Sequence, residues 1–184
     1  MGLPRRSWFT AVLIVAIGPL FVGCSSGQDK GSQGSLSVKL AASRPFIASD
    51  PMPQLVGARV AVSGIEARKS DGSWVPRECD PEVTLDLVAL DADGVSLPSH
   101  LFPEGQYSAL QLRFSRVDFR LGSGAEIELP APPTGWVVRI PADFAVLNDR
   151  ATALTLKLDP GASFRFGGGH FEFDPDVQFD GVVR

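Results

Sequence analysis

Residues 110–121 read LQLRFSRVDFRL, and this stretch decides the fold class. Apolar side chains occupy every second position from Leu110 to Phe114 and resume in the opposite phase at Val117. Alternation with period two is typical of a β-strand with one buried face, and a one-residue change of phase suggests a bulge. The stretch also carries three arginines, Arg113, Arg116 and Arg120. We expect the change of phase to divide them between two faces, as solvated charges.

The same alternation recurs along most of the chain. It is found in residues 36–40, 60–67, 73–75, 85–90, 127–129, 136–140, 154–158, 164–166 and 171–173. Gly, Pro, Asp or Asn separates nearly every pair of segments, Asp71-Gly72 is a hairpin signal, and Gly64 marks a second bulge. Residues 44–54 form a longer irregular connection. We predict an all-β fold, an antiparallel two-sheet sandwich.

The first 23 residues have a different character. Arg5 and Arg6 precede an apolar run from Trp8 to Val22, as in a secretory signal. The run contains Pro19 and is shorter than the roughly 20 apolar residues that span a bilayer. We therefore predict a cleaved signal peptide over residues 1–23 rather than a membrane-spanning helix.

The next residue is a cysteine, Cys24. The stretch Phe21-Val22-Gly23-Cys24 resembles a lipobox, although Phe21 stands where leucine is usual. The resemblance implies a diacylglyceryl group on Cys24, and two or more acyl chains hold a protein on a bilayer. The alternative is an ordinary signal peptide with a coincidental cysteine. By the sorting pattern of such lipoproteins, Ser25 and Ser26 favour the outer membrane of the bacterial cell envelope.

The remaining chain divides into a tether and one domain. Residues 24–34 offer nothing to bury after the cysteine, so we predict a flexible tether over these residues and a β-sandwich over residues 35–184.

The chain has 17 basic and 21 acidic residues, and loss of residues 1–23 would make it more negative still. No basic patch is available for a phosphate backbone, which excludes nucleic acid as a partner. With Cys24 lipidated, Cys79 has no disulfide partner; we interpret residues 76–81 as a polar loop and Cys79 as inert.

Several of these segments, in this order, resemble a bacterial lipoprotein family known only as a domain of unknown function (number 4382). The matching residues are 34–40, 60–68, 71–74, 85–90, 102–107, 110–112, 154–159 and 173–175. The resemblance implies a prealbumin-like or immunoglobulin-like sandwich and no established activity, so no functional residue is carried over. Residues 41–45 depart from the acidic turn usual in that family. The Pro103–Tyr107 turn resembles one common in such sandwiches; we expect Gly105 at positive φ and the Tyr107 ring inward.

Residues that could bind a metal do not form a complete set. Zinc needs three or four ligands, whereas His170 has only Glu172 beside it and His100 is distant in sequence. Residues 91–94 begin like a calcium loop but lack the later acidic ligands, and Asp174-Pro175-Asp176 offers only two carboxylates. We interpret these as turns and predict no metal and no cofactor.

Catalytic patterns are also lacking in the sequence. There is no Gly-x-Ser-x-Gly, and Gly167–Gly169 opens no helix that could bind phosphate. The acidic residues Glu126, Glu128 and Glu172 occupy the polar positions of alternating strands, which is typical of a solvated face. We therefore predict that the protein is not an enzyme; an unrecognised site near His170 and Glu172 is the least favoured alternative.

Two tryptophans could take part in binding. Trp136 begins an apolar run and is expected to pack in the core, whereas Trp74 lies beside a hairpin tip and could stack on a sugar ring. The leading hypothesis is a non-enzymatic envelope lipoprotein, a tethered β-sandwich that acts as a binding or structural module, with an unknown envelope protein or glycan as its partner. The alternative is a carbohydrate- or peptide-binding receptor component with Trp74 as its platform.

Overall fold

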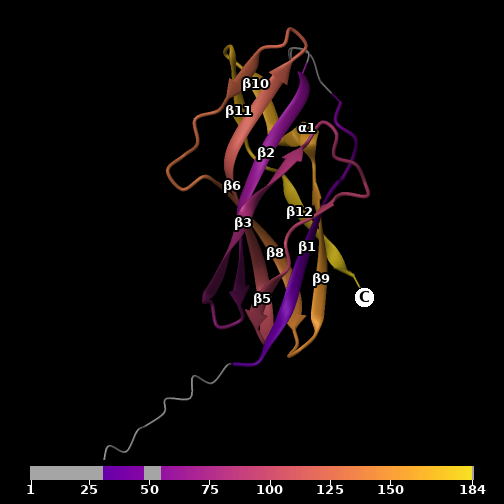
Figure 1. The fold of residues 1–184 in the computed structure, drawn as a ribbon, viewed down its shortest axis with the longest axis vertical. Coiled ribbons are helices and arrows are strands. Elements are labelled where there is room, and N and C mark those ends of the chain that lie inside the picture. Colours follow the sequence, from indigo (N-terminus) through magenta and orange to yellow (C-terminus); the bar gives the residue numbers. More distant parts are fainter. Residues whose placement is uncertain (1–30, 48–54, 184) are drawn as a thin grey trace, which may run out of the picture.

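The computed structural model describes residues 31–47 and 55–183. Within these ranges the strands form two five-stranded sheets and a separate hairpin (Figure 1). The prediction of an all-β fold is therefore confirmed, and the arrangement is consistent with a sandwich. Cys24 and the predicted signal peptide lie outside the described residues, as do residues 48–54 of the predicted connection. No helix in the described part of the chain has the length and apolar character to cross a membrane.

The first sheet has the order β12, β9, β1, with β4 and β5 both pairing along the other edge of β1. Its strands are β1 (Gln33–Ala42), β4 (Val95–Ser96), β5 (His100–Pro103), β9 (Ala151–Leu158) and β12 (Val177–Val183). Strands β1 and β9 run parallel, which differs from the predicted antiparallel sandwich. The periodicity of one strand does not indicate the direction of the strand beside it. Along the sequence, all strands of the second sheet lie between β1 and β9, which are nevertheless neighbours in space.

The second sheet has the order β3, β2, β6, with β7 and β8 both beside β6. Its strands are β2 (Leu55–Lys69), β3 (Trp74–Asp86), β6 (Gly105–Leu121), β7 (Glu126–Glu128) and β8 (Trp136–Val146). The remaining elements are the one-turn helix α1 (Pro160–Ser163) and the hairpin of β10 (Phe164–Gly167) and β11 (His170–Phe173). The hairpin lies at the end of the molecule opposite the start of β1 (Figure 1).

The second sheet has several register shifts, and two of them were expected from the sequence. The register of β2 shifts between Val62 and Gly64 against both neighbours, as predicted from Gly64. On β6, Val62 pairs with Phe114 and Ala61 with Arg116, so Ser115 is an extra residue. This extra residue keeps the apolar side chains on both sides of it in the core. The expected division of the arginines between two faces is therefore wrong: Arg113, Arg116 and Arg120 all lie on the outer face.

Two local predictions in β3 are also wrong. Residues 76–81 belong to the strand rather than to a loop, and Cys79 is only 4% exposed. Prolines are tolerated here because β3 is an edge strand. In addition, residues 79–82, which include Pro81, have no partner in β2. The predicted strand over 85–90 instead ends at Asp86, whose carboxylate accepts hydrogen bonds from the backbone of Ala58 and Val88, both at 3.1 Å. Val88 and Ala89 form a turn.

The core is one continuous cluster with a group of aromatic rings at the hairpin end. The ring of Phe119 stacks on Phe171 at 4.5 Å, and Phe173 meets Phe114 edge-on at 5.5 Å. At the other end, Gly105 has a positive φ and the buried Tyr107 ring stacks on Phe144 at 5.1 Å. The Tyr107 hydroxyl donates to the Pro103 carbonyl at 2.7 Å, so the expected corner is confirmed.

Candidate functional site

The candidate site lies on the outer face of the second sheet, where β3, β2, β6 and β8 lie side by side. Side chains directly opposite one another in the register share a face. Glu66 of β2, Gln111 of β6 and Arg139 of β8 form one such row, and Arg113 with Val137 forms the next. The sheet therefore brings together polar residues from three separate parts of the sequence.

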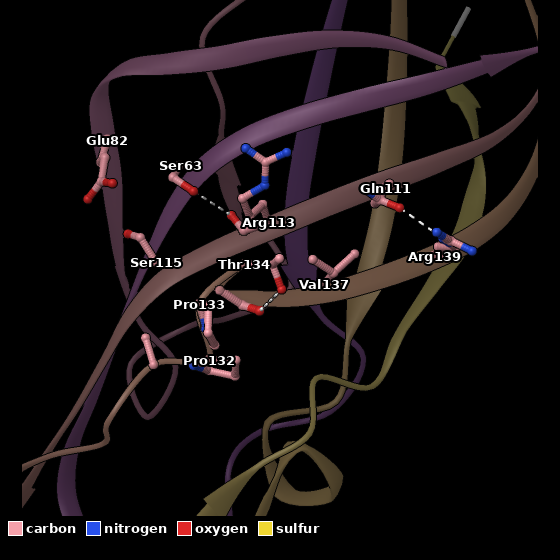
Figure 2. Close-up of a pocket in the computed structure, with 12 residues that line it drawn as sticks. Ser63, Glu82, Gln111, Arg113, Ser115, Pro132, Pro133, Thr134, Val137 and Arg139 are labelled. Carbon is pink, nitrogen blue, oxygen red and sulfur yellow. Dashed lines mark hydrogen bonds between the residues drawn. The ribbon is translucent and has the colours of Figure 1, made fainter. Parts of the chain in front are cut away.

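A groove of about 890 Å³ follows these rows (Figure 2). Its floor is the sheet, and one wall is the connection between β7 and β8, with Pro132, Pro133 and Thr134. Gly135 closes this wall with φ +70°, and a Cβ there would collide with the carbonyl oxygen of Phe114. Only glycine allows the connection to approach β6 so closely. The other lining residues are Ser63, Glu82, Gln111, Arg113, Ser115, Ala131, Val137 and Arg139.

Arg113 is held at the centre of the groove by two carboxylates. It pairs with Glu66 through one guanidinium nitrogen and with Glu78 through the other, at 3.2 Å. The Glu66 side chain is 16% exposed and the Arg113 side chain 32% exposed. A partly buried charge that loses its partner is costly, so these groups are expected to stay paired. Arg113 is thus a fixed part of the groove floor, and the carboxylates of Glu66 and Glu78 compensate its positive charge.

Arg139 connects the groove to Trp74. Its Nε donates to Oε1 of Gln111 at 2.9 Å, and its guanidinium lies 5.7 Å from the centroid of the Trp74 ring. A cation at this distance from an indole face is attracted by the ring quadrupole. Gln111 is itself only 8% exposed, so the residue that orients Arg139 is held within the sheet.

A second pocket, of about 490 Å³, adjoins the groove and shares Arg139 with it. We call it the tryptophan pocket. It is lined by Arg68, Gly72, Trp74, Ser108, Ala109, Arg139, Ile140 and Pro141. Trp74, predicted as a possible sugar platform, is half-buried here, and the Arg139 guanidinium lies over its ring. The groove and the tryptophan pocket adjoin at Arg139, and Trp74 gives this face an aromatic end.

The other tryptophan considered from the sequence lies elsewhere. Trp136 is half-buried and meets Phe173 edge-on, with ring centroids 5.7 Å apart. It therefore belongs to the aromatic group of the core, as its position before an apolar run indicated. Cys24, the predicted lipidation site, lies outside the described residues.

The possible metal ligands remain in small, separate groups. His170 Nε2 lies 3.1 Å from Glu172 Oε1 on the exposed face of β11. The Asp91 carboxylate accepts from the Gly94 backbone at 2.9 Å, as in a turn, and Asp174 pairs with Arg165 at 3.5 Å. The described ranges contain no cluster of three or more His, Cys, Asp or Glu side chains arranged to hold a metal.

Two further titratable groups are partly withdrawn from solvent. Burial raises the pKa of the Cys79 thiol, and the nearby carboxylates of Glu78 and Glu82 add to this effect. A nucleophilic cysteine requires the opposite shift, so Cys79 is poorly suited to such a role. Burial and the positive charge of Arg77 lower the pKa of His100, whose Nε2 is buried without a hydrogen-bond partner among the described residues.

Sequence analysis did not predict Glu66, Gln111 or Arg139 as site residues, and it predicted Arg113 only as a solvated charge. Each occupies a polar position of an alternating strand, which by itself indicates only a solvated face. Their common site depends on the order of β2, β6 and β8 in the sheet. The acidic residues Glu126 and Glu128 do not line the groove; Glu126 pairs with Arg59 at 3.4 Å.

Comparisons with known protein families, with curated proteins and with solved structures found no match to this chain. The protein is thus defined by its own features: an all-β fold in which one sheet carries a polar groove and a tryptophan pocket on its outer face.

Proposed function

We propose that this protein is a non-enzymatic lipoprotein of the bacterial cell envelope, a β-sandwich that is anchored by lipid at Cys24 and binds a ligand in the outer-face groove. The observation that carries the proposal is that Arg139 lines both the groove and the tryptophan pocket, so the two hollows adjoin on one face of the sheet. Clefts of about 300–1,000 Å³ with a few oriented polar groups are typical of ligand sites.

The groove is also preorganised. Arg113 is fixed by Glu66 and Glu78, and Arg139 is fixed by Gln111. Side chains that already hold their bound geometry lose less conformational entropy when a ligand arrives, which favours affinity. This supports a binding role for the face.

The chemistry of the lining supports binding rather than catalysis. The Ser63 hydroxyl donates to the Arg113 carbonyl at 3.3 Å and the Ser115 hydroxyl to the Ala61 carbonyl at 3.5 Å. Neither has a histidine beside it in the lining, whereas an activated serine needs a base within hydrogen-bond reach. Turnover of a substrate that was lost in Glu66→Gln or Glu78→Gln would contradict the proposal.

The position of the pocket relative to the domain start is compatible with a ligand near a membrane. The Glu104 amide donates to the Ser32 carbonyl, and the Ser70 amide donates to the Gln106 carbonyl. The β2–β3 turn therefore lies at the same end of the molecule as the start of β1 (Figure 1). An extended chain from Cys24 to Gln33 spans at most about 30 Å, so an anchor at Cys24 keeps this end close to the bilayer.

The anchor is tested by mass spectrometry of the mature protein isolated from membranes. We expect a diacylglyceryl group on Cys24 and loss of residues 1–23, and we expect Cys24→Ala to move the protein to the soluble fraction. An unmodified thiol or a retained leader would contradict the placement in the envelope.

Ligand binding is tested with arrays of envelope glycans and peptides. Binding should weaken in Arg113→Ala and Arg139→Ala and persist in Arg120→Ala, an exposed arginine of the same sheet that does not line the groove. A carbohydrate- or peptide-binding receptor component is the more specific form of the proposal, and it is favoured by Trp74. Ligand binding that did not change in Trp74→Ala would exclude that form.

A further inference from the structure

We infer that the tryptophan pocket binds the carboxylate-bearing ring of an acidic saccharide, such as a uronic acid unit. The inference rests on the proposed function and names the class of ligand for part of the same site. Its basis is the combination of two uncompensated arginines, an indole ring and a hydroxyl group in one pocket.

The charge of the pocket is positive although the protein as a whole is acidic. Arg68 and Arg139 line the pocket, and no described Asp or Glu does. Neither arginine forms an ion pair with a described residue, whereas Arg44, Arg59, Arg113, Arg116 and Arg165 all do. An anionic ligand would therefore meet two guanidinium groups that have no carboxylate to displace.

Two carboxylates of the β2–β3 hairpin are engaged by other groups. The Asp71 carboxylate accepts from the Ser73 amide at 2.8 Å and from the Ser73 hydroxyl at 2.6 Å. Glu66, next to Arg68 along the same face of β2, is paired with Arg113. The Asp71 carboxylate keeps its charge but is held by Ser73 and does not line the pocket, and the Glu66 charge is paired with Arg113.

The polar groups suit a carboxylate attached to a ring. Gln111 accepts a hydrogen bond only from Nε of Arg139. The two terminal guanidinium nitrogens therefore remain able to bind a carboxylate through two parallel hydrogen bonds. The part of the Trp74 ring that the Arg139 guanidinium does not cover offers an apolar surface beside them, and the Ser108 hydroxyl can pair with a sugar hydroxyl. A volume of about 490 Å³ lies within the range of small-ligand pockets.

The sheet favours a saccharide over a peptide at this point. Strand β2 is paired on both sides, by β3 and β6, and β6 is paired there by β2 and β8. A peptide that adds to a sheet needs an unpaired strand edge. Trp74 and Arg139 come from the edge strands β3 and β8, but the floor between them, with Arg68 and Ala109, lies over backbone that is paired on both sides. Recognition must therefore come from side chains, which suits a ligand rich in hydroxyl and carboxylate groups.

The test is titration calorimetry of the mature protein with trisaccharides of galacturonate, glucuronate and mannuronate, each matched to its neutral galactose, glucose or mannose counterpart. We expect at least one acidic trisaccharide to bind at least tenfold more tightly than its neutral match. Arg68→Gln and Arg139→Gln should each weaken that binding at least tenfold, and Arg120→Gln should not. Arg139→Lys, which keeps the charge without the fork, should lie in between, and thermal unfolding should show that all variants are folded.

Equal binding of the neutral match, binding that does not change in Arg68→Gln, or no binding of any acidic trisaccharide would each overturn the inference. If a neutral glycan or a peptide binds instead, with dependence on Arg113 or Arg139, the inference fails while the proposed function stands. If no glycan or peptide binds the groove at all, both fail.

Discussion

Gln111 accepts a hydrogen bond at 2.9 Å from Nε of Arg139, across the boundary between β6 and β8. Gln111 is almost completely buried, whereas Arg139 is exposed. The contact thus links the interior of the sheet to the one residue that lines both the groove and the tryptophan pocket. We therefore expect ligand binding to depend on Gln111, although Gln111 itself is barely accessible to a ligand.

The first prediction concerns this contact. Replacing Gln111 by leucine removes the acceptor but keeps the side chain similar in size, so the free energy of unfolding should fall by only about 0.5–1.5 kcal/mol. Ligand binding should weaken more, because Arg139 is no longer oriented. Calorimetric titration and urea unfolding measure the two effects. Gln106→Leu, at an exposed position of the same strand, is the control and should change neither. Unchanged ligand affinity in Gln111→Leu would contradict the role given to this contact.

The corner at Tyr107 makes a second prediction. Tyr107→Phe keeps the stacked ring but removes the hydrogen bond to the Pro103 carbonyl, which should cost about 1 kcal/mol of unfolding free energy. Tyr107→Ala also removes the ring and should cost about 3–5 kcal/mol, as for other large aromatic residues. Chemical denaturation separates the two contributions. Equal losses in the two variants would mean that the ring contributes nothing.

The wall of the groove makes a third prediction, with a matched control. Gly135 and Gly124 both have positive φ, but a Cβ at Gly135 would meet the Phe114 carbonyl while one at Gly124 would meet nothing within 4 Å. Gly124→Ala should therefore cost about 1 kcal/mol for backbone strain alone, and Gly135→Ala clearly more. Only Gly135→Ala should also weaken ligand binding, since it displaces the Pro132–Gly135 wall. Similar losses of unfolding free energy in both variants would argue against the close approach to β6.

The aromatic group gives a fourth prediction. Phe173 contacts Phe114, Trp136 and Phe164 and is nearly buried. Phe173→Ala should lower the free energy of unfolding by about 3–5 kcal/mol and change the tryptophan fluorescence through Trp136. Phe173→Leu should cost less, because it fills more of the cavity. An unfolding midpoint unchanged in Phe173→Ala would show that the hairpin does not pack as described.

The fifth prediction concerns pH. Burial, together with Arg77, lowers the pKa of His100 below its ordinary value of 6.5, so the folded protein binds this proton less readily than the unfolded chain. Stability from this group is present above pH 6.5 and is lost as the pH falls from 6.5 toward the lowered pKa of the folded state. The free energy of unfolding, measured between pH 8 and pH 5, should therefore decline less in His100→Gln than in the wild type. An equal decline in His100→Gln and in the wild type would contradict this prediction.

The sequence by itself was sufficient for the class of fold and for some local features. Side chains of a strand alternate between two faces, so the pattern of residues 36–40 or 110–114 reveals a strand wherever its neighbours lie. The bulge at Gly64 was also predictable, because the change of phase within its own strand marks it. The corner at Gly105 and Tyr107 was predictable because it depends on a positive φ and on a contact four residues apart.

The tertiary structure decided which residues form the site. Gln111 and Arg139 are 28 residues apart and meet only because β6 pairs with β8. The pairing of β1 with β9 and the shared face of the three β6 arginines likewise depend on register between strands. Register is set by the packing of whole sheets around a core, and hydrophobic alternation within a single strand does not specify it.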